Sequence, residues 1–192
     1  MHFSIVTPTI ARQSLILLCQ TLDVQTYQDY EHLIVVDIPF GELTEEQKTI
    51  LHKAMNNNER RQLYFCEKRH RNTGNSCRRS VAPLMKGEYA FYIDDDDYFA
   101  GPDVLETLSK IKEDWAIFPV MLQGRRIYSD PPQLCNISTG GFMHRKGLAV
   151  WPDGDVYEAD WAIVTQLLGK YNYKALPEFV TVIHPVDHFG RP

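Results

Sequence analysis

The sequence lacks several features that would place it in common functional classes. It has only four cysteines, Cys19, Cys66, Cys77 and Cys135, and their scattered positions form no paired metal-binding motif. We therefore expect reduced thiols, mainly in the core, in a cytoplasmic protein. A surplus of positive charge is also absent, because the formal net charge is −5. That balance argues against a nucleic-acid binder.

Long apolar runs, repeats and linkers are missing as well. The apolar segment from Leu15 to Cys19 is too short for a signal-peptide core, and no run is long enough to span a membrane. No internal repeat or low-complexity linker divides the chain. We expect one domain over residues 1–192, with enough chain to bury a proper core. Assembly into a homodimer stays open.

One stretch dominates what the sequence does contain. Aromatic and β-branched residues from Tyr89 to Ile93 are typical of a buried strand, and four aspartates, 94–97, follow directly. Adjacent carboxylates at a strand end repel one another, so a hard divalent cation such as Mg²⁺ or Mn²⁺ would compensate them. If the chain stays extended, Asp94 and Asp96 point to one side of it. The alternative is an acidic turn that caps a helix near Pro102.

The first half of the sequence alternates strand and helix signals. Strands are expected over residues 3–6, 32–37, 62–66 and 89–93, and helices over 14–22, 45–55 and 75–85. This order predicts an α/β fold with a mostly parallel central sheet flanked by helices. In the second half we expect strands over 115–123, 125–128 and 180–184, and helices over 102–111 and 158–170.

Five stretches occur in the order in which one enzyme family carries them. They are Ser4–Thr9, Gln25–Asp37, Asn72–Gly74 with Arg78 and Arg79, Gly87–Asp97, and Thr139–Phe142 with Glu158–Trp161. In these stretches the chain resembles the GT-A nucleotide-sugar glycosyltransferases, particularly the large inverting family 2. The resemblance implies a GT-A fold in which about residues 1–100 bind the nucleotide sugar and about 101–192 bind the acceptor.

The resemblance implies a metal site in the acidic stretch and in the tail. Asp96 would coordinate the metal, Asp94 would contact the ribose or the metal's water shell, and Asp95 belongs to the same cofactor-binding group. His184, with His188 as second choice, would complete the coordination. An imidazole ligand would favour Mn²⁺ over Mg²⁺.

The nucleotide is expected to contact further residues of the first half. Asp37 would accept the N3 hydrogen of uracil, beside a wall formed by Thr7, Pro8 and Thr9. Asn72 belongs to the same group. Either Arg78 or Arg79 would approach the diphosphate, with a solvated helix position as the alternative for each.

Catalysis by inversion requires a base opposite the leaving diphosphate, because an acceptor hydroxyl is a poor nucleophile. The resemblance points to Asp160, with Glu158 as the second choice. A plain structural role for Asp160 is a charge at a helix N-terminus. Trp151, Tyr157 and Trp161 are candidates for stacking on sugar rings, with core packing as the alternative.

The expected function is transfer of a sugar, with inversion and Mn²⁺ or Mg²⁺, from a nucleotide-sugar donor to a carbohydrate or other hydroxyl acceptor. A UDP-sugar is the donor we expect. One alternative is a metal-dependent phosphohydrolase or nucleotidyltransferase, although the aspartyl-phosphate type would carry its acids after the first strand, where Thr7–Thr9 stand. Another is a non-catalytic, calcium-dependent carbohydrate-binding module, which would not need the strand ending at Asp37 or the Asn72–Gly74 loop.

Overall fold

Strands and helices alternate through the first half of the chain, in the order that the sequence predicts. The computed structural model describes residues 1–156 and 158–183. Its strands are β1 (Phe3–Thr9), β2 (Tyr30–Val36), β3 (Arg61–Phe65), β4 (Tyr89–Tyr92), β5 (Asp97–Phe99), β6 (Trp115–Ile117), β7 (Val120–Leu122), β8 (Arg125–Ile127), β9 (Phe142–Arg145), β10 (Tyr173–Ala175) and β11 (Thr181–Ile183). Its α-helices are α1 (Ser14–Asp23), α2 (Glu45–Met55), α3 (Asn75–Val81), α4 (Val104–Ser109) and α5 (Ala159–Leu167), and its short 3₁₀ turns are η1 (Phe40–Glu42), η2 (Ala82–Leu84) and η3 (Thr139–Gly141).

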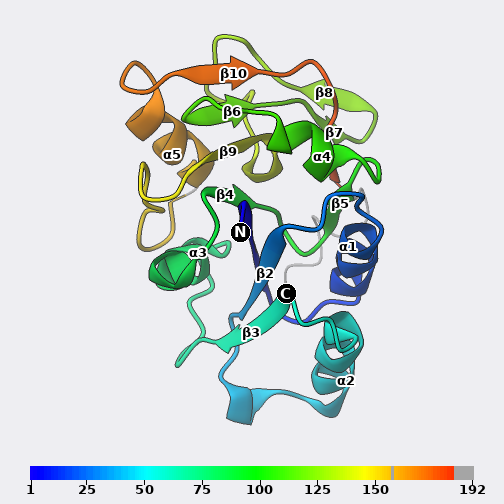
Figure 1. Ribbon diagram of the computed structural model, residues 1–192. Helices are drawn as coiled ribbons and strands as arrows, with labels where there is room; N and C mark the ends of the chain where they lie inside the picture. Colours follow the sequence, from blue (N-terminus) through cyan, green and yellow to red (C-terminus); the bar gives the residue numbers. More distant parts are fainter. Residues whose placement is uncertain (157, 184–192) are drawn as a thin grey trace.

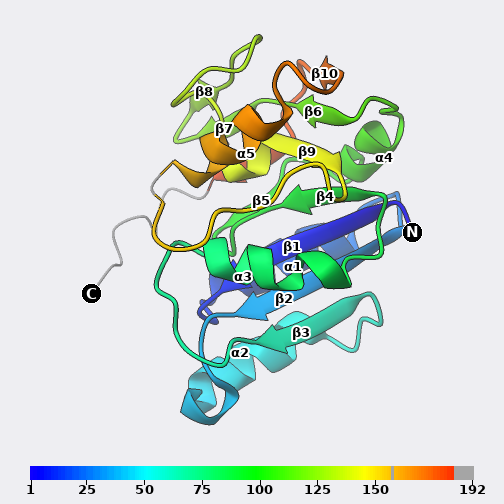
Figure 2. The same ribbon diagram turned by 90° about the vertical axis from the view of Figure 1, so that its left-hand side faces the viewer.

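The large sheet has the strand order β10-β6-β9-β4-β1-β2-β3. Strands β4, β1, β2 and β3 run parallel, β9 runs antiparallel to β4 and β6, and β10 is parallel to β6. Figure 2 shows the four parallel neighbours side by side behind α3. The predicted mostly parallel sheet is therefore confirmed. Its carboxyl edge brings together the residues that follow β1, β2, β3 and β4.

A second, four-stranded sheet has the order β5-β11-β7-β8. The sequence predicted one strand over residues 115–123, and this prediction was wrong. The segment splits into β6, which joins the large sheet, and β7, which joins the small one. Pro119 lies between them and has no N–H for a ladder hydrogen bond, which explains why the strand is interrupted there.

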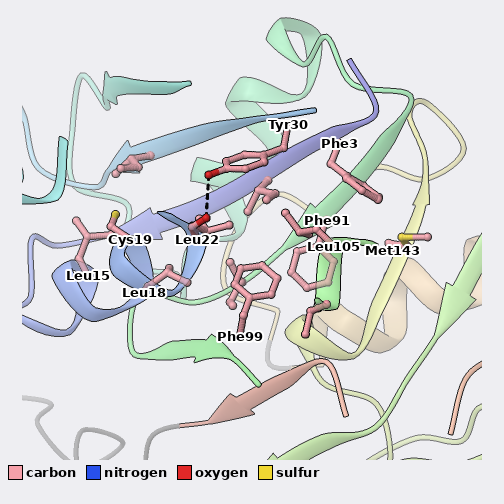
Figure 3. Close-up of a cluster of buried hydrophobic side chains, with 14 of the residues drawn as sticks. Phe3, Leu15, Leu18, Cys19, Leu22, Tyr30, Phe91, Phe99, Leu105 and Met143 are labelled. Carbon is pink, nitrogen blue, oxygen red and sulfur yellow. Dashed lines mark hydrogen bonds between the residues drawn. The ribbon is translucent and has the colours of Figure 1, made fainter. Parts of the chain in front are cut away.

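Helices cover both faces of the large sheet. Figure 1 shows α3 and α5 on one side of it and α1 and α2 on the other. Successive residues of β1 point to opposite faces of the sheet. Ile5 packs in the cluster that includes side chains of α1, α2 and α4, whereas Val6 packs in the cluster that includes side chains of α3 and α5. Figure 3 shows the first cluster, in which the Tyr30 hydroxyl donates to the Leu22 carbonyl at 3.0 Å. Each large side chain buried in this way stabilises the fold by about 1.5–3 kcal/mol.

Local signals set the helix ends. Thr44 and Gln47 form a reciprocal capping box at the start of α2, as predicted, and Asn56 ends the helix in the left-handed conformation. Three helices are shorter than predicted. Helix α3 ends at Val81, before the η2 turn, α4 extends only over Val104–Ser109, and α5 ends at Leu167, just before Gly169 at φ +75°.

Gly87 allows β4 to begin close to β1. Its N–H donates to the Ser4 hydroxyl at 2.8 Å, and a Cβ at this position would lie 2.3 Å from the Ser4 nitrogen. Only a residue without a side chain fits this approach. The glycine before the acidic stretch therefore has a packing role.

Three of the four cysteines are buried, as predicted, but Cys135 is exposed. The prediction was wrong for Cys135 because that residue lies in the irregular segment between β8 and β9, away from both hydrophobic clusters. None of the helices in residues 1–156 and 158–183 has the length and apolar character needed to cross a membrane.

Candidate functional site at the carboxyl edge of the sheet

The four consecutive aspartates lie at the carboxyl end of β4. The extended chain stops at Tyr92, and the Asp97 N–H donates to the Asp94 carbonyl at 3.1 Å, which closes a turn. This turn overrides the alternation predicted for an extended chain. Asp95 and Asp96 consequently reach the same partner, Arg12, so the extended conformation on which the predicted alternation depends is not present here.

Arg12 was not among the residues selected from the sequence. Its Nη1 donates to Asp96 Oδ2 at 2.9 Å, and its Nη2 donates to Asp95 Oδ1. Burial disfavours the charge, but the two carboxylates outweigh it and raise the pKa of Arg12. A basic residue soon after the end of β1 was the available signal, because β1 and β4 are parallel neighbours and end at the same edge.

The end of β1 fixes Arg12 through strained backbone. Ala11 has φ +63°, a conformation that costs a residue with a Cβ about 1–2 kcal/mol. The Thr9 hydroxyl accepts from the Ala11 N–H at 2.8 Å and donates to Asp95 Oδ2 at 2.5 Å. Thr9 thus joins the β1 turn to the aspartates. Strained residues held by such contacts are common at functional sites.

Arg78 approaches the aspartates from α3. The side chain is 2% exposed, its Nη2 donates to Asp94, and its Nη1 donates to the Thr73 carbonyl at 2.9 Å. Arg79 is exposed and its Nη1 donates to the Trp151 carbonyl at 2.9 Å. Of the two arginines left open by the sequence, Arg78 is the one beside the acidic cluster.

Trp151 is a structural support and is not available to a sugar ring. It is 1% exposed, and the Arg78 guanidinium lies over its ring at 4.4 Å. A cation held over an indole is attracted by the negative face of the ring. The sugar-stacking role for Trp151 was therefore wrong. Trp161 is partly buried against the α3 and α5 cluster.

The aspartates outnumber the arginines that pair with them. Arg12 and Arg78 form ion pairs with Asp94, Asp95 and Asp96. Asp97 is 4% exposed, and within the described residues its buried Oδ1 has no hydrogen-bond partner. Burial, with the neighbouring carboxylates, raises the pKa of Asp97 well above its usual value.

This donor set fits a hard divalent cation. The carboxylates supply only oxygen atoms, the chemistry that Mg²⁺ and Mn²⁺ prefer, and the orphaned Asp97 oxygen lacks a partner that a cation would provide. Asp96 is shared with Arg12, so a metal bound by Asp96 must share that carboxylate or displace the guanidinium. His184 and His188, the other expected ligands, lie outside the described residues.

Asp37 follows β2 at the same edge and holds the next loop. It is 7% exposed, and its Oδ1 and Oδ2 accept from the backbone N–H groups of His70 at 2.8 Å and Arg71 at 3.0 Å. Each carboxylate oxygen retains a second lone pair, so these bonds do not exhaust its capacity to accept. The sequence did not indicate this anchoring role.

The residues expected to form a wall beside Asp37 are buried. Thr7 is 0% exposed and its Oγ1 lies 2.9 Å from His32 Nε2. Pro8 is also buried and packs on Gly74, where an added Cβ would meet the proline ring at 2.5 Å. In the described structure these two side chains therefore pack inside the protein at the carboxyl end of β1.

Asn72 fastens the loop to the start of α3. It is 4% exposed, and its Nδ2 donates to the Ser76 hydroxyl at 2.6 Å. Both residues border an open pocket of about 420 Å³, which His70 and Asp153 also line. The aspartates 94–97 do not line this pocket.

Asp160 lies at the start of α5, and two charged residues of the acidic cluster region, Arg78 and Asp94, act on its pKa. Its Oδ1 accepts from the Thr139 hydroxyl at 2.8 Å. Burial raises the pKa of Asp160, Arg78 acts to lower it and Asp94 to raise it. Glu158 is exposed and makes no side-chain cap for the helix. Tyr157, the remaining aromatic candidate, lies outside the described residues.

Comparisons with known proteins identify the fold. Neither a protein-family model nor a curated protein sequence matches the chain. Solved structures do match. Residues 1–349 of S. aureus TarS share 17% identity over 96% of this chain and 60% of that one, with a TM-score of 0.77. The same protein in complex with UDP-GlcNAc gives 17% identity and a TM-score of 0.74, over 95% of this chain and 58% of that one.

A mannosyltransferase from Pyrobaculum calidifontis, PcManGT, in complex with GDP-Man and Mn²⁺, shares 14% identity with a TM-score of 0.70, over 98% of this chain and 58% of that one. The chain has a GT-A-like fold. The GT-A-like fold expected from the sequence is thus confirmed. The chain spans 58–60% of the length of these TarS and PcManGT chains.

Proposed function

We propose that this chain transfers a sugar from a nucleotide-sugar donor, a UDP-sugar, to a hydroxyl acceptor with inversion, and that it does so with a divalent metal. One observation carries the proposal. Arg78 is buried against Trp151 and paired with Asp94, and it also acts on the pKa of Asp160. A diphosphate-binding cation, a metal-binding acid and a candidate base thus occupy one neighbourhood.

Donor binding would use the carboxyl edge of the sheet. Arg78 carries the charge and the fork of N–H donors that suit a diphosphate, and it would have to turn from Asp94 and the Thr73 carbonyl to reach one. Asp37 retains accepting capacity for a base N–H while it holds the loop at residues 70–71. The TarS structures in complex with UDP and with UDP-GlcNAc support a uridine donor for a chain of this fold.

The metal would be held by Asp96 and Asp94, with the Asp97 oxygen available nearby. When bound, a divalent ion stabilises the negative charge that develops on the leaving diphosphate without any proton transfer. The Mn²⁺ complex of PcManGT supports this assignment. Arg12 would release or share Asp96 as the metal binds.

Asp160 would act as the base. Burial raises its pKa, and a carboxylate with a raised pKa is a stronger base at neutral pH. It takes the proton of the acceptor hydroxyl while the oxygen forms a bond to the anomeric carbon and the diphosphate leaves on the opposite side. Help of this kind contributes about 10²–10⁴-fold to the rate.

The test is release of the nucleoside diphosphate across a panel of UDP- and GDP-sugars with Mn²⁺, followed by acceptor screening with the best donor. Asp160→Asn should bind UDP like the native protein and lose most of the transfer. Glu158→Gln is the matched control and should keep it. If Asp160→Asn retains near-native transfer while Glu158→Gln is inactive, the base has been assigned to the wrong acid. A panel in which no donor is turned over or bound contradicts the proposed function.

A further inference from the structure

A second cluster of metal-binding side chains lies at the same edge of the sheet, apart from the aspartates. The carboxylate of Asp37, the thiol of Cys66 and the imidazole of His70 each offer a ligand atom, and these atoms all lie within 4.8 Å of one another. The topology explains the meeting. Val36 and Phe65, the last residues of β2 and β3, are paired in register, so Asp37 and Cys66 occupy equivalent positions one residue further on.

Backbone hydrogen bonds hold the side chains of this cluster in place, as they usually do for metal ligands. Ligand carboxylates are held in orientation by hydrogen bonds from outside the first shell. Asp37 accepts two backbone N–H bonds from the loop, from His70 and Arg71, and the Cys66 N–H donates to the Val36 carbonyl at 3.0 Å. Asp37 and Cys66 are buried, whereas His70 is half-buried and lines the pocket of about 420 Å³. Of the three ligands, His70 is the one that this pocket exposes to an incoming ion.

A second thiol stands beside the first. Cys77 Sγ, on α3, lies 3.6 Å from Cys66 Sγ. Cys77 is not among the residues whose ligand atoms all lie within 4.8 Å of one another, so it supports Cys66 from behind and is not counted as a ligand.

We propose that Asp37, Cys66 and His70, with Cys77 beside them, form a binding site for a thiophilic transition-metal ion, Zn²⁺. Sulfur and imidazole ligands select such an ion, and they disfavour the Mg²⁺ or Mn²⁺ that the oxygen-only aspartates suit. The ion would tie β2, β3 and the loop at residues 67–74 together. Asp37 is also the residue proposed to accept the base N–H, so an ion at this site and a uracil base would compete for its carboxylate, whereas Cys66 and His70 have no role in the proposed donor binding.

The experiment is a Co²⁺ titration of the reduced protein, with Co²⁺ as a coloured substitute for Zn²⁺. A Cys135→Ser background removes the exposed thiol, which could bind metal by itself. We expect a thiolate-to-cobalt charge-transfer absorption in the near ultraviolet that Zn²⁺ abolishes by displacement. A Co²⁺ ion held only by the aspartates would bind without this absorption, since they contain no sulfur.

Two variants decide the assignment. Cys66→Ser should lose the charge-transfer absorption, and His70→Ala should weaken Co²⁺ binding by more than about 100-fold, beyond the usual cost of losing an outer-shell partner. His52→Ala, an exposed histidine on α2, is the matched control and should bind as before. Because His70 is on a loop, its variant remains informative if Cys66→Ser disturbs folding. Absence of the absorption in the Cys135→Ser protein, its survival in Cys66→Ser, or equal affinity in His70→Ala and His52→Ala overturns the proposal.

Discussion

Replacing Arg12 with alanine should destabilise the protein in a way that a divalent metal repairs. The guanidinium pairs with Asp95 and Asp96, whose side chains are 1% and 6% exposed. Without Arg12, both carboxylates remain out of water with no cation, although the Thr9 hydroxyl still donates to Asp95.

The expected loss follows from burial. Removing one partner of a fully buried ion pair costs about 3–5 kcal/mol. Arg12 is 35% exposed, so water partly solvates the freed carboxylates, and we take about 3 kcal/mol as the expected value. For a chain of this size that corresponds to roughly 6–12 °C in the melting temperature. Mn²⁺ at 100 times its dissociation constant would return about 2.7 kcal/mol.

The assay is thermal unfolding with and without Mn²⁺, followed by circular dichroism. Arg12→Ala should melt lower than the native chain and gain more from Mn²⁺, because in the native chain the metal must share Asp96 with Arg12 or displace the guanidinium. Arg125→Ala, which removes an exposed arginine on β8, is the control and should change little. A melting temperature of Arg12→Ala equal to that of the control, or a smaller response to Mn²⁺ than the native chain shows, would refute the role of Arg12 as a built-in counter-cation.

Two further predictions concern histidines. Burial lowers the pKa of His32 to about 3 and of His144 to about 4, so the native state holds both neutral while the unfolded chain takes up protons near pH 6.5. The stability that these histidines contribute is therefore fully present above that pH and is lost as the pH falls toward 4, by about 1.4 kcal/mol per pH unit for each residue. Urea unfolding at several pH values measures this dependence: the free energy of unfolding should change less steeply with pH in His144→Gln than in the native protein, and just as steeply in His52→Gln. Equal pH dependence in all three proteins would contradict the prediction. In the tail, we expect His184→Ala or His188→Ala to weaken Mn²⁺ binding in the presence of UDP and to make the Mn²⁺ affinity fall less steeply below about pH 6.5. Calorimetry that finds the Mn²⁺ affinity and its pH dependence unchanged in both variants would show that the tail is not part of the metal site.

The sequence predicted what local patterns determine. The strand and helix order of the first half, the capping box at Thr44 and the acids that end β2 and β4 were all readable, because each depends on a few neighbouring residues. Parallel strands then bring their carboxyl ends together, so the location of the candidate site also followed.

The sequence could not predict which side chains meet across that edge. Arg12 belongs to the turn after β1, and its pairing with Asp95 and Asp96 depends on the left-handed Ala11 and on the turn at the aspartates. The choice between Arg78 and Arg79 likewise depends on which face of the short α3 packs against Trp151. These contacts join residues far apart in the sequence, and periodicity gives no signal for them.

The central claim is that the aspartates after β4 bind a nucleoside diphosphate through a divalent metal. Titration calorimetry of UDP, with and without Mn²⁺, tests it on the native protein and on Asp96→Ala, with far-ultraviolet circular dichroism to verify folding. The account predicts that the native protein binds UDP only when Mn²⁺ is present and that folded Asp96→Ala does not bind it under either condition. An unchanged UDP affinity in Asp96→Ala, or equal affinity of the native protein with and without Mn²⁺, would contradict it.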